Sequence, residues 1–222
     1  GIQLNYIEAL QAYVAENEPN GGVVTEQFNQ FLQDIGYIAV EANALRTDAS
    51  KEEIMGTLDF SQGPWQDTVS VDKFYIINSY VEPPVETKVR LLWDDEYIYV
   101  GYENFDDDLS GLISGGLSDS GFWWASGQDD SNETYITANP DEPFLGFFSN
   151  PEGVHFARPQ SVPTDYVEPE WDVNANIGED RWNSIQAIPF DVIGVDPNED
   201  SSLQAIFFRS YHGADAYIGW EG

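Results

Sequence analysis

The pattern of apolar and polar positions changes once along the chain, near residue 50. Before that point apolar residues recur at helical spacing, first over residues 7–14 and then over a second run that continues through Ala42 and Leu45. The turn-forming residues 18–22 separate the two runs. We therefore expect residues 1–50 to form an α-helical hairpin, a first domain whose apolar faces must dock on another surface.

From about residue 54 the pattern is one of short strands with alternating polarity, separated by Gly, Pro, Asn and Asp. The clearest hairpin joins residues 87–93 to residues 97–102 through the polar turn Asp94-Asp95-Glu96. Further strands are expected at residues 75–77, 133–137, 144–148, 154–157, 172–177, 182–188, 203–209 and 216–220. The second domain, residues 51–222, is therefore predicted to be mainly β, an antiparallel β-sandwich of immunoglobulin-like or jelly-roll-like type.

Composition and charge narrow the classes of partner. Hydrophobic residues make up 41% of the chain, which is enough for a buried core and excludes global disorder. The formal net charge of -32 disfavours nucleic acid and acidic membrane surfaces as partners. The sequence has no cysteine, which excludes disulfides, thiolate metal sites and cysteine nucleophiles. No segment is apolar over the roughly 18 residues that a membrane-spanning helix needs.

A long loop over residues 106–128 carries the adjacent pair Trp123 and Trp124 between small residues. Small neighbours leave a large ring free to project, and exposed indole rings stack on the C–H faces of sugars. Three acidic residues that follow soon after could accept hydrogen bonds from sugar hydroxyls: Asp129, Asp130 and Glu133. Alternatively, one of the two Trp side chains folds back and caps the sandwich. Four other Trp residues lie in strand-like patterns and are expected in the core: Trp65, Trp93, Trp171 and Trp182.

Clusters of acidic residues in the same loop region are candidate ligands for calcium. Ca²⁺ takes about six to eight oxygen ligands, typically from carboxylates and loop carbonyls. The candidate metal ligands are Asp106, Asp107, Asp108, Asp129 and Asp130. In a chain this acidic, the same clusters could also be solvated surface.

No sequence motif supports an enzyme. His155 and His212 are the only histidines, and neither belongs to an HExxH motif or to a pair with metal-ligand spacing. The chain has no nucleophile elbow and no glycine-rich phosphate loop. With 40 acidic residues, a pair of facing carboxylates of the glycosidase kind stays possible, but no pair stands out. We therefore expect a protein without catalytic residues.

From residue 54 onward the sequence resembles the family 9 carbohydrate-binding modules and their DOMON-like relatives. The resemblance rests on the order and spacing of motifs across about 165 residues. These motifs are Ile54-Met55-Gly56-Thr57-Leu58-Asp59 with Trp65, residues 87–100, residues 129–136, Asn150-Pro151-Glu152-Gly153, Trp171-Asp172, and Arg181-Trp182 running to residues 187–190. The resemblance implies a β-sandwich that binds sugars, often as an accessory to a secreted polysaccharide-degrading enzyme, with structural calcium in some members.

The resemblance also implies roles for individual residues. Glu133 matches a family carboxylate that bonds a sugar hydroxyl, and Trp123 or Trp124 lies near the family's first stacking Trp. At the position of a family binding Arg, on the strand after Glu133, this chain has Leu145 or its neighbours. DOMON-like relatives bind b-type haem through Met and His; here the only Met is Met55, expected in the opening strand and more typical of a core residue.

Three functions follow from these observations. The first is a non-catalytic, extracellular carbohydrate-binding module that holds a neutral glycan through its loop Trp residues. The second is a structural subunit of a cell-surface assembly, a filament, surface layer or adhesin, in which the N-terminal hairpin docks on a neighbouring copy. The third is a haem-binding DOMON-like protein. The sequence does not identify the glycan.

Overall fold

The computed structural model describes residues 13, 14, 18, 22, 23 and 27, and then residues 41–76, 81–114, 129–138, 143–159, 166–199, 202–211 and 216–221. The chain divides into two compact units, residues 1–41 and residues 42–222. In the first unit the described residues 13, 14, 23 and 27 are helical. Most of the predicted helical hairpin lies outside the described residues, so the hairpin and its docking on a neighbour stay predictions.

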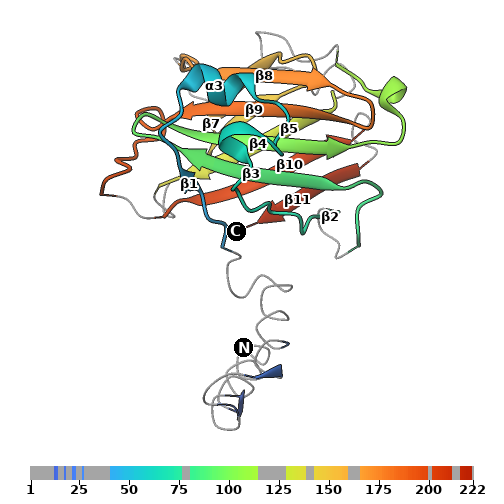
Figure 1. Ribbon diagram of the computed structural model, residues 1–222, viewed down its shortest axis with the longest axis horizontal. Coiled ribbons are helices and arrows are strands. Elements are labelled where there is room, and N and C mark those ends of the chain that lie inside the picture. Colours follow the sequence, from blue (N-terminus) through green and yellow to red (C-terminus); the bar gives the residue numbers. More distant parts are fainter. Residues whose placement is uncertain are drawn as a thin grey trace. The chain divides into compact units, whose positions relative to one another are not determined.

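The described part of residues 42–222 is built from two β-sheets and short helices (Figure 1). The five-stranded sheet has the order β1-β3-β4-β9-β8, with β1 at Leu45–Arg46, β3 at Thr87–Trp93, β4 at Tyr97–Phe105, β9 at Arg181–Pro189 and β8 at Asp172–Ile177. The six-stranded sheet has the order β2-β11-β10-β5-β6-β7, with β2 at Tyr75–Ile76, β11 at Ala216–Glu221, β10 at Gln204–Tyr211, β5 at Ser131–Thr137, β6 at Leu145–Ser149 and β7 at His155–Pro159. The mainly β prediction is confirmed, and each predicted strand overlaps an observed one.

The hairpin between β3 and β4 forms as its sequence predicts. Asp94 Oδ1 accepts hydrogen bonds from the backbone N–H groups of Glu96 and Tyr97, at 2.8 and 2.7 Å. The Tyr99 hydroxyl donates to the other oxygen of the same carboxylate at 2.6 Å. The acidic turn is thus held by its own side chain, as aspartate in such turns commonly is.

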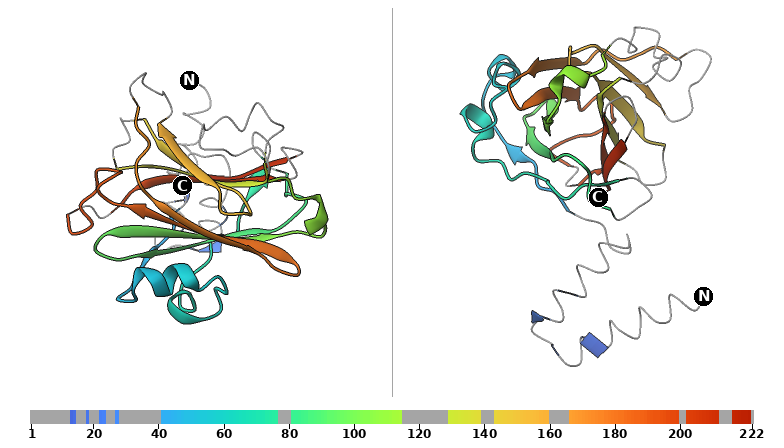
Figure 2. Two further views of the ribbon diagram at one scale, coloured as in Figure 1. Left: turned by 90° about the horizontal axis from the view of Figure 1, so that it is seen from above. Right: turned by 90° about the vertical axis from the view of Figure 1, so that its right-hand side faces the viewer.

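Three short helices accompany the sheets: α3 at Lys51–Gly56, η1 at Gly63–Trp65 and η2 at Leu109–Gly111. Figure 2 shows α3 and η1 on the outer side of the five-stranded sheet. There Phe60 and Trp65 pack against Tyr99 in a buried cluster, with ring centroids of the first two 4.8 Å apart. Gly101 makes room for this cluster, because a Cβ at that position would lie 2.9 Å from Phe60 and 3.1 Å from Trp65.

Between the two sheets, polar side chains bond to one another across the interior. The amides of Asn104 on β4 and Asn132 on β5 exchange two hydrogen bonds of 2.9 Å. Nearby, the hydroxyls of Tyr102 and Thr134 lie 2.7 Å apart, and Thr134 donates to Gln186 on β9 at 2.7 Å. All of these side chains are fully buried. Fully bonded interior networks of this kind fix how two sheets are placed against each other.

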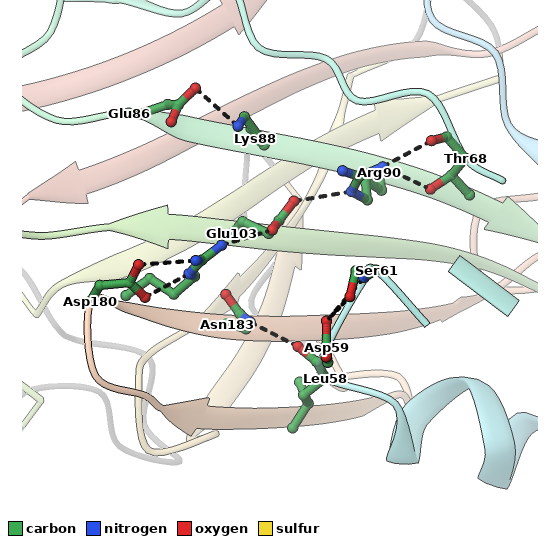
Figure 3. A network of polar contacts seen from close by, with 11 residues as sticks. Leu58, Asp59, Ser61, Thr68, Glu86, Lys88, Arg90, Glu103, Asp180 and Asn183 are labelled. Atoms are coloured by element: carbon green, nitrogen blue, oxygen red, sulfur yellow. Dashed lines mark hydrogen bonds and ion pairs between the residues drawn. The ribbon is translucent and has the colours of Figure 1, made fainter. Parts of the chain in front are cut away.

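A second polar network lies on the outer face of the five-stranded sheet (Figure 3). Glu103 on β4 pairs with Arg90 on β3 at 3.0 Å and with Arg181 on β9 at 3.2 Å. Arg90 also donates to the backbone carbonyl of Thr68, and Arg181 pairs with Asp180. Arg90 and Arg181 therefore link three adjacent strands through Glu103, and both guanidinium groups are paired with carboxylates of the same chain.

Two sequence predictions near the start of this unit are wrong. Leu45 lies in β1, which pairs in parallel with β3, and does not continue a helix. Met55 lies in α3 rather than in an opening strand, and its side chain packs against the Phe60–Trp65 cluster as a core residue. The helix begins here because Ser50 caps it, its Oγ accepting from the N–H of Glu53 at 3.2 Å.

The predicted core Trp residues are buried in three of four cases: Trp65, Trp171 and Trp182. Trp93 is half-buried instead, with the Arg46 guanidinium over its ring at 5.6 Å from the centroid.

Among the described residues, no helix combines the length and apolar character needed to cross a membrane.

Candidate functional site

Strand β5 presents Glu133 and Tyr135 on the outer face of the six-stranded sheet. Their neighbours Asn132 and Thr134 contact the five-stranded sheet, and successive side chains of a strand point to opposite faces. The register places Glu133 between Phe148 on β6 and Phe208 on β10. Glu133 is therefore flanked by an aromatic side chain on each neighbouring strand.

These rings belong to an outer-face aromatic patch, defined as Tyr135, Phe148, Phe156 and Phe208. The Tyr135 ring meets Phe148 and Phe208 edge to face, with centroids 5.5 and 5.6 Å away, and Phe148 stacks on Phe156 at 4.6 Å. Gly146 allows this packing, because a Cβ there would lie 2.9 Å from the Phe148 ring and 3.0 Å from the Tyr135 ring. Tyr135 and Phe208 are only half-buried, so the patch reaches solvent.

Glu133 is the carboxylate within this patch, and its side chain is incompletely bonded. The residue is 4% exposed. Its Oε2 accepts a hydrogen bond from the Tyr135 hydroxyl at 2.8 Å, while its Oε1 has no hydrogen-bond partner among the described residues. Burial raises the pKa of the Glu133 carboxyl to about 7, although the Tyr135 hydroxyl and the charge of Arg158 oppose that rise. A buried acceptor without a donor is costly unless a proton or a ligand hydroxyl satisfies it.

Arg158 on β7 is a further residue of this site that the sequence did not indicate. It pairs across β6 and β7 with Gly146 and lies on the same face as the aromatic patch. Its guanidinium carbon is 5.7 Å from the centroid of the Phe148 ring. The sequence offered no signal for this placement, because Arg158 opens an irregular, proline-containing stretch.

The predicted stacking residues Trp123 and Trp124 lie outside the described residues. Their part in a binding site therefore stays a prediction. Glu133, the third predicted binding residue, lies at the centre of the aromatic patch.

Four of the five predicted calcium ligands, Asp106, Asp108, Asp129 and Asp130, bond through their carboxylates to other parts of the described chain. Asp106 is buried, and its Oδ2 pairs with the buried guanidinium of Arg209 at 3.1 Å. Burial lowers the pKa of Arg209 to about 10, although the charges of Asp106 and Asp130 oppose that change. Asp108 donates its backbone N–H to Asp106 Oδ1 at 2.9 Å. The carboxylate of Asp106 therefore already pairs with a buried cation of the same protein.

Asp129 and Asp130, which directly precede β5, are fully buried. Asp129 accepts from the Asn150 amide at 2.9 Å, and Asp130 accepts from the backbone N–H of Ile113 at 2.8 Å. Within the described ranges, no three or more acidic or histidine side chains gather in a way that could hold a metal ion. Calcium binding by these residues and Asp107 stays a prediction.

A cleft of about 420 Å³, lined by none of the four residues of the aromatic patch, lies at the starts of β4, β7 and β8 and the end of β9. Lys51 occupies part of it, with its ammonium 4.0 Å from the centroid of the Tyr97 ring and 2.5 Å from Asp172. Glu168, on the same cleft, accepts from the backbone N–H of Ala157 at 2.7 Å. These charged side chains are thus bonded to other parts of the chain.

No family model and no curated protein matches the sequence. Several solved structures match the fold, and two of them show how far the likeness extends. A Bacteroides uniformis protein to which carbohydrate binding has been ascribed has a TM-score of 0.56 and 10% identity, over 82% of this chain and 88% of that one. A family 9 carbohydrate-binding module from Caldicellulosiruptor kristjanssonii, solved with cellotriose, has a TM-score of 0.55 and 14% identity, over 81% of this chain and 83% of that one.

The likeness covers more than four-fifths of this chain in both comparisons. At such low identity it concerns the fold and not the ligand. The chain therefore has a fold like that of the family 9 carbohydrate-binding modules, which confirms the resemblance noted in the sequence at the level of structure.

Proposed function

We propose that this protein is a non-catalytic carbohydrate-binding module that holds a neutral glycan on the outer face of its six-stranded sheet. The observation that carries the proposal is the Glu133 carboxylate, buried among aromatic rings with one oxygen that lacks a hydrogen-bond donor. A sugar suits such a patch, because its C–H faces pack on half-buried aromatic rings such as Tyr135 and Phe208 and its hydroxyls form hydrogen bonds with polar groups on the same face.

The charge of the chain favours a neutral glycan over an acidic one. With a formal charge of -32, the protein repels polyanions, including uronate-rich or sulfated polysaccharides. The fold supports the proposal by analogy, since the two similar structures described above are both carbohydrate-binding by description. In this proposal Trp123 and Trp124 add stacking surface to the site, and the module serves a secreted polysaccharide-degrading enzyme.

A glycan-array screen tests the proposal. We expect the parent protein to bind neutral β-linked or α-linked oligosaccharides and not their sulfated or uronate-containing counterparts. A Trp123→Ala/Trp124→Ala variant should bind more weakly if the loop stacks on the sugar, and Glu133→Ala should abolish binding. The surface variant Glu179→Gln, which changes an exposed carboxylate in the turn after β8, is the control.

Absence of binding across the array, by a protein whose circular dichroism shows a folded β structure, would contradict the proposal. Binding that survives Glu133→Ala would keep the function but reject the site.

A further inference from the structure

Strand β7 forms one edge of the six-stranded sheet, because among the described strands only β6 pairs with it. Directly before β7, the N–H of Asn150 donates to the carbonyl of Val154 at 3.0 Å. In an antiparallel pair, the backbone groups of successive residues point alternately toward the partner strand and away from it. The backbone groups of His155, Ala157 and Pro159 therefore point away from β6, toward the edge of the sheet.

Side chains, and not another strand, satisfy the outward backbone groups of Ala157. Its N–H donates to Glu168 Oε1 at 2.7 Å, and its carbonyl accepts from the Tyr166 hydroxyl at 2.8 Å. Burial raises the pKa of Tyr166 to about 12, and the charge of Glu168 adds to that rise, so the hydroxyl keeps the proton that it donates. These two side chains thus take the places of the carbonyl and the N–H of a paired strand.

Both side chains belong to residues 166–170, named here the strap, which precede β8 and form neither helix nor strand. Among the residues that the structure describes, no backbone–backbone hydrogen bond joins the strap to the rest of the chain. Glu168 is exposed. An extended chain that brings its own backbone to this edge can therefore replace the two bonds of the strap like for like.

A second copy of β7 fits this edge in one register. A symmetric antiparallel pairing centred on Ala157 sets His155 against Pro159, which has no N–H to donate. Centred on Phe156 instead, the pairing sets His155 of one copy against Ala157 of the other, so that each N–H of these residues meets a carbonyl. The Phe156 side chains of the two copies then face each other beside the aromatic patch, where aromatic pairs across strands are stabilising.

We propose that β7 is a strand-addition edge for a second copy of this chain, and that Tyr166 and Glu168 hold this edge closed in the isolated protein. Displacement of the strap lets two β7 strands pair, which joins the six-stranded sheets of both copies and the aromatic patches on them. The net charge of -32 opposes this pairing, and salt weakens that repulsion. The inference goes beyond the proposed function, because it concerns self-association and requires no glycan.

The test measures self-association by sedimentation equilibrium in about 1 M NaCl, which screens the net charge. The double variant Tyr166→Phe/Glu168→Ala removes both side-chain bonds to Ala157. We expect it to dimerise at least about tenfold more tightly than the parent, because the edge no longer has to be opened. The matched control is Glu170→Ala, which removes an exposed carboxylate of the same strap but neither bond, and should behave as the parent does.

Two further measurements show whether β7 is the edge that pairs. His155→Pro, added to the double variant, removes an N–H that the pairing needs, and proline is tolerated where the N–H of an edge strand points outward. We expect this triple variant to be monomeric. In dilute double variant, the N–H of Ala157 should exchange with solvent at least about tenfold faster than in the parent, and it should regain protection as the dimer forms.

Equal self-association of the parent and the double variant would overturn the inference. A dimer that persists in a folded triple variant, or that leaves the exchange of Ala157 unprotected, would also overturn it, because another surface would then join the copies. If the double variant does not fold, Tyr166→Phe alone decides the question: this change removes one oxygen atom and should strengthen dimerisation in the same direction. None of these outcomes depends on whether the protein binds a glycan.

Discussion

The buried carboxyl of Glu133 makes the stability of the protein depend on pH in a predictable way. The pKa of this group rises on folding from 4.5 to about 7, mainly because burial penalises the charged form. The folded chain then holds its proton at pH values where the unfolded chain has released it. The unfolded state is therefore favoured progressively as pH rises through that interval, and the loss is complete above about pH 7.

The size of the effect follows from the separation of the two pKa values. One pKa unit corresponds to about 1.4 kcal/mol, so a change from 4.5 to about 7 costs about 3 kcal/mol at most. About 2 kcal/mol of this falls between about pH 5.5 and about pH 8.5, a range that avoids the low solubility expected near the isoelectric point. Glu133→Gln removes the titrating group while keeping the shape of the side chain.

The assay is urea unfolding of the parent and of Glu133→Gln at about pH 5.5 and about pH 8.5, in about 0.5 M NaCl to screen other charges. We expect the stability difference between the two proteins to change by about 2 kcal/mol in favour of Glu133→Gln at the higher pH. All other titrating groups are common to both proteins and cancel. Glu179→Gln, which removes an exposed carboxylate, is the control for loss of one surface charge. A difference between the parent and Glu133→Gln that is equal at both pH values would refute the reasoning.

Three further predictions concern the fold. Arg209→Met leaves Asp106 without its buried guanidinium partner and should lower the free energy of unfolding by about 3–5 kcal/mol; a stability within error of the parent in urea unfolding would contradict it. Gly146→Ala places a Cβ against Phe148 and should cost about 1–3 kcal/mol, whereas Gly56→Ala, with open space around its Cβ, should not destabilise. The melting temperature should rise between about 10 mM and about 500 mM NaCl, since salt screens the net charge of -32. A lower melting temperature in EDTA than without it would support the predicted calcium site, and an unchanged melting temperature would reject it.

Sequence pattern alone identified the strands whose side chains alternate. β3 and β4 are recognised because alternating runs flank an Asp-rich turn, and the same local chemistry builds the turn in the structure. The segment around α3 was misassigned because its signal is short. A cap at Ser50 and a helix of six residues show less periodicity than a strand, and the packing of Phe60 and Trp65 against the sheet decides the structure there.

The site was predictable only in part. Resemblance pointed to Glu133, but no local pattern shows that its carboxylate is buried between Phe148 and Phe208, because that depends on the pairing of β5 with two strands distant in sequence. Arg158 reaches the same face through a third strand, β7. The neutralisation of Asp106 by Arg209 is likewise a tertiary contact, since nearly the whole second half of the chain separates the two residues.

The central claim is that a neutral glycan binds on the outer face of the six-stranded sheet. The most direct measurement is an NMR titration of isotope-labelled protein with the best-binding oligosaccharide of the array, following backbone and side-chain shifts. The account predicts that the largest shifts fall on Glu133, Tyr135, Arg158 and Phe208 and saturate together. Shifts confined to the α3 side of the five-stranded sheet, or to the cleft around Lys51, would contradict it.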